Sequence, residues 1–146
     1  MTEKQKELLL RDLCGRLPYG VKVVSVFINP DTKEHKSCGI EVFNATSLLM
    51  IRDGLGEFKP YLFPLSSMTD EQWKELRNLI YEYFALDEEF NEGICYKTYG
   101  DILVWLDEKP INECYFIFDY FNKNHFDYRG LIPMGLAIDA TNLNIY

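Results

Sequence analysis

Metal-binding and redox motifs are missing from this sequence. Its 146 residues include only two histidines and four cysteines, and neither a C-x-x-C pair nor an H-E-x-x-H motif occurs. These absences exclude the usual zinc ribbons and thioredoxin-type sites. We therefore expect no metal and no cofactor, and we expect the scattered cysteines to be small core or near-core residues: Cys14, Cys38, Cys95 and Cys114.

Long apolar stretches are also missing. No segment approaches the ~20 consecutive apolar residues that a membrane-spanning helix needs. Residues 1–16 mix both charge signs and do not contain the apolar part of a secretory signal. The sequence therefore predicts a cytoplasmic protein with no membrane partner.

Positive charge is scarce in the second part of the chain. Residues 1–60 hold nine Lys or Arg against eight Asp or Glu, whereas residues 61–146 hold six against fifteen, and the formal net charge is -8. An acidic surface repels phosphate backbones, and no run of Lys and Arg offsets this repulsion. We expect no direct nucleic-acid binding, and a protein partner, with a basic one favoured, fits the charge better.

Apolar and aromatic residues, in contrast, are plentiful. The hydrophobic fraction is 47% and the aromatic fraction 15%, which excludes intrinsic disorder. A chain of this length buries roughly 68–70% of its unfolded surface. We expect one globular domain over residues 1–146.

The first half of the chain predicts a helix followed by strands. Apolar spacing predicts a helix over residues 3–14, which Gly15 would end. Residues 21–28, VKVVSVFI, are apolar on both faces, which is typical of a central strand covered on both sides. After a polar connection at residues 29–37, two further strands would turn near residues 44–45 and complete an antiparallel meander.

The middle of the chain predicts an extended segment and then a helix. Two prolines favour an extended linker over residues 57–67, lying across the core. Thr69 and Gln72 match a capping box, and an apolar stripe follows at helical spacing. This pattern predicts a helix over residues 70–84.

The last third carries weaker signals. Residues 94–107 fit either a hairpin or a strand followed by a helix. Asn112 would cap a helix over residues 113–124, and a short strand is expected at residues 136–138. The whole pattern predicts an α+β fold in which a small antiparallel sheet of about three to five strands packs against about three helices.

His125 to Arg129 form the densest group of chemically active side chains. His125 could transfer protons, Asp127 could orient it, and Tyr128 and Arg129 could hold a substrate. Catalytic groups are usually assembled from distant parts of a sequence, however, and no nucleophile accompanies these residues. We favour a structural interpretation, in which His125 faces the negative end of the preceding helix, Asp127 and Arg129 pair locally or with neighbours, and Gly130 bends the chain.

Four weaker candidates are better explained as structure. Residues 53–58, DGLGEF, lack the spacing of a phosphate-binding loop, and His35 lies in a loop without a second histidine nearby. The acidic residues within 87–92 lack the spacing of a calcium loop. The aromatic run at residues 114–121 resembles a stacking platform, but helical spacing would bury most of its rings.

Three segments resemble a known protein family in their amino-acid sequence. They are LLLRDLCGRLPYGVKV (8–23), KPYLFPLSSMT (59–69) and NKNHFDYRGLIPMGLAIDA (122–140). They look like segments of a family of small uncharacterised proteins encoded by gut bacteria and by their phages and prophages. The resemblance implies a mobile-element context and brings no activity, ligand or catalytic residue with it.

These observations favour a non-enzymatic protein-interaction domain, an adaptor or an inhibitor. One alternative is a small enzyme or ligand-binding protein with a pocket around His125–Arg129. Another is an acidic mimic of DNA, which would require acids spaced along an exposed ridge.

Overall fold

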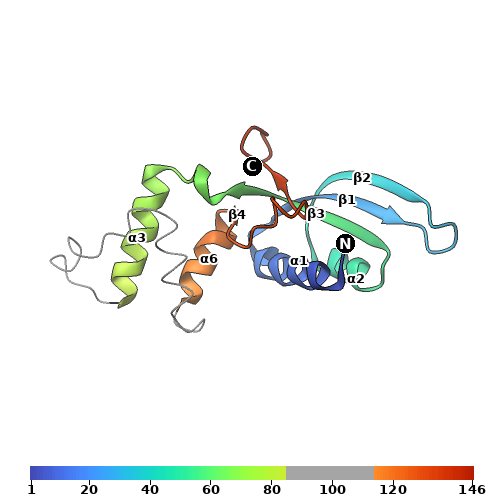
Figure 1. Cartoon of the computed structure of the whole chain (residues 1–146), viewed down its shortest axis with the longest axis horizontal. Helices are drawn as coiled ribbons and strands as arrows, with labels where there is room; N and C mark the ends of the chain where they lie inside the picture. The colour runs from blue at the N-terminus through green and yellow to red at the C-terminus, as the bar shows by residue number, and fades with distance from the viewer. Residues whose placement is uncertain (85–113) are drawn as a thin grey trace.

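The computed structural model describes residues 1–84 and 114–146. The helices in these ranges are α1 (Glu3–Arg16), α2 (Ala45–Arg52), α3 (Asp70–Phe84) and α6 (Tyr115–Lys123), with the short 3-10 helices η1 (Leu17–Tyr19) and η2 (Leu65–Ser67). The strands are β1 (Lys22–Ile28), β2 (His35–Val42), β3 (Gly56–Pro64), β4 (Phe126–Asp127) and β5 (Ile138–Asp139). The predicted α+β class is confirmed, and the molecule is elongated, with the β1–β2 hairpin at one end and α3 at the other (Figure 1).

Strand β3 organises the sheet because it pairs with three other strands in turn. Residues 56–60 pair antiparallel with β1, residues 61–62 pair parallel with β5, and residues 63–64 pair parallel with β4. Strand β2 pairs antiparallel with the other edge of β1. The sheet is therefore mixed, and the predicted meander is wrong, since β1 lies between β2 and β3.

The predicted linker over residues 57–67 is wrong, because most of it is β3. Two prolines suggested a linker, yet both keep the chain extended, which suits a strand equally well. The N–H of Ile28 donates to the C=O of Leu55 at 2.9 Å. Strand alternation then turns the nitrogen of Pro60 away from β1, so the hydrogen-bond ladder needs no N–H there.

The predicted turn near residues 44–45 is also wrong, because a helix starts at this point. Asn44 Oδ1 accepts from the N–H groups of Thr46 and Ser47, at 2.9 and 3.2 Å, and caps α2. Ser47 and Ile51 are buried one turn apart, which gives the segment a helical rather than an alternating pattern. The hairpin in this region is instead formed by β1 and β2.

Helix α1 is longer than predicted. Gly15 does not end it, since the helix runs to Arg16 and the chain turns only at Gly20, where φ is 63°. A Cβ atom on Gly15 would lie 2.9 Å from Nδ2 of Asn122. Glycine at this position therefore permits the close approach of α1 and the end of α6.

Helix α3 begins at the predicted residue, Asp70, and is described as far as Phe84. The side chains of Thr69 and Gln72 form the two reciprocal hydrogen bonds of the capping box, at 3.2 and 2.9 Å. The helix expected over residues 113–124 is present as α6. Its expected cap, Asn112, and the undecided segment 94–107 lie outside the described residues.

Within residues 1–84 and 114–146 the core forms two clusters. The first lies between α1, α2 and the sheet and includes Leu13, Val23 and Leu62. The second joins α3, α6 and β4 and includes Leu76 and Phe121. β3 contributes side chains to the first cluster and packs Phe63 against the second. Each cluster is built from side chains that are far apart in the sequence.

One face of β1 is less covered than predicted. Val21, Val23 and Ser25 are buried, whereas Val24 and Val26 on the opposite face are only half-buried. The expected strand at residues 136–138 is shifted, since β5 begins at its last residue. Among the described residues no helix is long and apolar enough to cross a membrane.

Candidate functional site

His125 to Arg129 lie where α6 ends and β4 begins, as the structural interpretation predicted. His125 has a left-handed backbone, with φ 58°, and its N–H donates to the C=O of Asn122 at 3.2 Å. Its own C=O accepts from the N–H of Phe63 at 2.9 Å, which ties the helix end to β3. Gly130, with φ 71°, completes the bend after Arg129.

Asp127 and Arg129 do not pair with each other; each contacts other groups of the protein, which is the second of the two expected arrangements. Asp127 is buried, and its two carboxylate oxygens accept from the backbone N–H groups of Leu131 and Ile132, at 2.8 and 2.7 Å. The Nε atom of Arg129 lies 3.4 Å from Oδ1 of Asp12 instead. The carboxylate of Asp127 holds the following turn, and the guanidinium of Arg129 reaches back to α1.

Asp12 and Arg16 form a fully buried ion pair on α1. The distances are 2.6 Å from Nε to Oδ2 and 3.0 Å from Nη2 to Oδ1, and Nη2 also donates to the C=O of Phe126 at 2.7 Å. The ring of Tyr128 lies 5.6 Å from the guanidinium of Arg16 and 4.8 Å from that of Arg129. The aromatic ring therefore stabilises two positive charges that share one carboxylate.

The imidazole of His125 stacks on the ring of Tyr146, with 4.1 Å between centroids and 13° between planes. Burial, together with the positive charges of Arg16 and Lys22, lowers the pKa of His125 to about 4. The ring is thus neutral near pH 7, and the expected attraction of a charged histidine to the helix end is not made. The Tyr146 hydroxyl accepts from the N–H of Lys22 at 3.1 Å and donates to the C=O of Tyr61 at 2.9 Å.

The four candidates His125, Asp127, Tyr128 and Arg129 are brought together, but all contact the protein's own groups. Their partners belong to α1, β3, the turn at residues 131–132 and the chain around Tyr146. None of the four lines the cavity described below. Their shared position joins segments that are far apart in the sequence.

The weaker candidates fall at separate places. His35 starts β2 and is exposed, and residues 53–58 form the turn after α2 and the start of β3. The aromatic run at residues 114–121 forms α6, with most of its rings covered. The acids within 87–92 lie outside the described residues. In the described part of the chain no three potential metal ligands gather.

The cysteines only partly match their prediction. Cys114 is buried, as expected, but Cys14 and Cys38 are exposed, so the core interpretation is wrong for these two. Cys14 lies on the solvent side of α1, and Cys38 lies on the edge strand β2. Cys95 lies outside the described residues.

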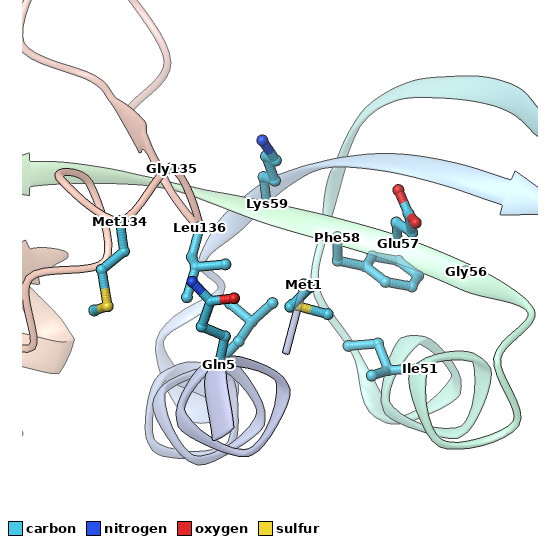
Figure 2. Close-up of a pocket in the computed structure, with 11 residues that line it drawn as sticks. Met1, Gln5, Ile51, Gly56, Glu57, Phe58, Lys59, Met134, Gly135 and Leu136 are labelled. Carbon is cyan, nitrogen blue, oxygen red and sulfur yellow. The ribbon is translucent and has the colours of Figure 1, made fainter. Parts of the chain in front are cut away.

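A cavity of about 320 Å³ lies between α1, α2, β3 and the loop before β5 (Figure 2). Most side chains that line it are apolar: Met1, Leu9, Ile51, Phe58, Met134 and Leu136. Gln5 adds a polar side chain, whereas Glu57 and Lys59 project from the opposite face of β3 in Figure 2 and line the cavity with their backbones. The volume lies within the range of ligand sites, ~300–1,000 Å³.

The cavity lies beside a strand edge without a partner strand among the described residues. Because Leu55 accepts from Ile28 of β1, alternation directs the backbone N–H and C=O of Gly56 and Phe58 away from β1. On that edge β5 pairs only with residues 61–62, and Ala140 N donates to Leu62 at 2.8 Å. Gly56 and Phe58 are buried. Buried backbone N–H and C=O groups rarely lack a hydrogen-bond partner in folded proteins.

This site was missed in the sequence for two reasons. Its main wall, residues 56–59, was assigned to a linker, and α2, which provides Ile51, was assigned to a strand. The apolar residues that line it also carry no motif, since Leu, Ile and Met are ordinary core residues. The two methionines are the clearest local signal, because flexible thioethers suit a surface that adapts to a ligand.

Comparisons with protein-family models, curated proteins and solved structures give no match to this chain.

Proposed function

We propose that this chain is a non-enzymatic protein-interaction domain, an adaptor or inhibitor, that receives a segment of a partner protein in the cavity beside β3. The observation that carries this proposal is the combination of an apolar cavity with a strand edge that has no partner strand in the described part of the chain. An apolar wall and backbone donors and acceptors bind a polypeptide well, but they supply no acid, base or nucleophile for a reaction. The protein would act in the cytoplasm.

Two further features support binding over catalysis. The chemically active side chains of His125–Arg129 contact other parts of the protein, as described above. The acidic charge of residues 61–146 favours a protein partner over nucleic acid, with a basic partner surface favoured. The resemblance to proteins of gut bacteria and their phages adds a mobile-element context, in which the partner would be a host or phage protein.

Site-specific photocrosslinking tests this function. Met134→p-benzoylphenylalanine places the reactive group at the cavity mouth, where Met134 is 39% exposed. Leu143→p-benzoylphenylalanine is the matched control, since Leu143 is 43% exposed and does not line the cavity. In bacterial lysate we expect position 134 to form an adduct that position 143 does not, and mass spectrometry of the adduct should locate one contiguous partner segment.

Competition and salt decide whether the adduct is specific. An excess of unlabelled wild-type protein should prevent it, at both low and moderate salt. Equal labelling at the two positions, or no adduct at position 134 at either salt concentration, would rule out a protein-binding role for the cavity.

A further inference from the structure

The strand edge beside the cavity also specifies what kind of segment fits. We propose that the site binds an extended peptide, which adds a short strand to β3 at Gly56–Phe58 and places one apolar side chain in the cavity. This inference rests on the proposed function and adds the chemistry of the ligand to it.

Backbone geometry carries the first step. The N–H and C=O of Phe58 point to the same edge of β3, away from β1, and the N–H and C=O of Gly56 do the same two residues earlier. An extended chain presents its own donors and acceptors at this two-residue repeat. Strand addition would therefore satisfy buried backbone groups that have no partner strand among the described residues.

The length of the added strand is limited on one side. Pro60 has no N–H, and the next two residues of the edge, 61–62, are already paired with β5. The loop at residues 134–136 turns away before it can continue this pairing, because Gly135 has φ 70° and its N–H donates to Ile132 at 2.9 Å. The peptide consequently pairs along a short stretch, and its affinity depends strongly on the side chain that it buries.

The orientation of β3 side chains determines the peptide's pattern. Residues directly opposite one another in a sheet project from the same face. A peptide residue opposite Phe58 would point towards α1 and α2, into the apolar cavity (Figure 2). Its two neighbours would lie beside Glu57 and Lys59 on the other face. The preferred sequence is therefore an apolar residue between one basic and one acidic residue.

Synthetic peptides test this inference on the full chain. The probes are fluorescein-labelled heptapeptides of Thr with Lys-Leu-Glu or Glu-Leu-Lys at the centre, measured by fluorescence anisotropy. At least one order should bind saturably, Lys-Leu-Glu if the added strand is parallel to β3 and Glu-Leu-Lys if it is antiparallel. Asp in place of the central Leu should weaken binding at least about tenfold, because a carboxylate would enter an apolar cavity.

Backbone methylation separates strand addition from simple side-chain burial. The N–H that pairs with Phe58 belongs to the Leu if the added strand is antiparallel and to the following residue if it is parallel, so N-methyl groups on both residues remove the pairing hydrogen in either direction. One lost hydrogen bond, worth about 1 kcal/mol, corresponds to about fivefold weaker binding. Unchanged affinity after methylation, or equal affinity for Asp and Leu, would overturn the inference. Met134→Trp should block the cavity mouth and weaken binding similarly, whereas Leu143→Trp should leave it unchanged.

The two proposals can fail separately. If position 134 crosslinks a partner but no heptapeptide binds, the domain binds proteins by another mode and only the strand-addition inference is wrong. If position 134 captures no partner segment, the proposed function itself is wrong.

Discussion

At the scale of single residues, the carboxylate of Asp12 has the most demanding environment. It is fully buried and is contacted by the guanidinium groups of Arg16 and Arg129. Arg16→Met would remove the bidentate partner and the donor to Phe126, and breaking a buried ion pair costs about 3–5 kcal/mol. We expect the free energy of unfolding, measured in urea, to fall by this amount.

An exposed ion pair provides the control for this variant. Glu7 and Arg11 are also four residues apart on α1, but both side chains are largely exposed. Arg11→Met should therefore cost less than about 1 kcal/mol. A similar loss for the two variants would show that burial does not determine the contribution of Arg16.

His125 should make stability depend on pH. Its pKa is 6.5 in the unfolded chain and about 4 in the folded protein, so the unfolded chain binds the proton more readily between these values. The neutral ring thus contributes stability that is present above pH 6.5 and lost as the pH falls towards 4. The expected loss is roughly 1–3 kcal/mol, measured as the free energy of unfolding across this interval.

His125→Asn separates this effect from the titration of carboxylates. Asparagine tolerates the left-handed backbone at this position and has no proton to gain. The variant should be less stable near pH 7, since it loses the stacking on Tyr146, but its stability should fall less between pH 6.5 and 4. Parallel pH profiles for the two proteins would contradict the assignment to His125.

Gly15 illustrates a conflict between helix propensity and packing. Alanine is favoured over glycine inside a helix by about 1 kcal/mol. At this position, however, the new Cβ would lie 2.9 Å from Nδ2 of the buried Asn122. We expect Gly15→Ala to lower the melting temperature in the wild-type chain and to raise it in an Asn122→Ala background. A stabilising effect in both backgrounds would mean that α1 and α6 can separate without cost.

At the scale of elements, α2 depends on its cap. Asn44 accepts hydrogen bonds from two backbone N–H groups, and Oγ of Ser47 accepts one from the N–H of Asn44 at 3.4 Å. Asn44→Ala should therefore cost about 1 kcal/mol of unfolding free energy, measured in urea. Asn142→Ala is a matched control at an exposed position and should change stability by less than about 0.5 kcal/mol.

The elements predicted correctly are those with local signals at their ends. α3 has a capping box at its start, followed by apolar residues at helical spacing. Neighbouring residues alone are therefore enough to predict this helix. α2 and β3 lack such clarity. The apolar run before Arg52 fits a helix or a strand, and the two prolines of β3 fit a strand or a linker. In both cases the packing against distant segments decides between conformations that are locally equivalent.

At the scale of the whole molecule, the two core clusters should unfold together. β3 contributes Phe58 and Leu62 to the first cluster, and Phe63 packs against the second. Leu13→Ala would create a cavity in the first cluster, at a cost of about 2–5 kcal/mol. α3 lies in the second cluster. We expect its amide hydrogens to exchange faster in the Leu13→Ala variant than in the wild type when exchange occurs through unfolding of the whole molecule. Unchanged exchange in α3 would indicate two separately folding units.

The three segments at residues 8–23, 59–69 and 122–140 meet in the folded protein. Arg16 of the first donates to Phe126 of the third, Asp12 of the first lies 3.4 Å from Arg129 of the third, and Phe63 of the second donates to His125. These three segments therefore form one structural junction. This arrangement is a physical reason for the polar cluster that requires no reaction.

The sequence by itself determined the α+β class, the helices near residues 3–14, 70–84 and 113–124, and the end of a helix near His125, because periodicity, caps and turn residues act over a few neighbours. Only the tertiary structure decided that residues 56–64 form the central strand, that Asp12 pairs with Arg16 and Arg129, and that a cavity lies beside β3. These features depend on contacts between residues up to 110 positions apart. Which residues of β3 are left without a partner strand in the described part of the chain depends on where β5 pairs, and no local sequence pattern encodes that position.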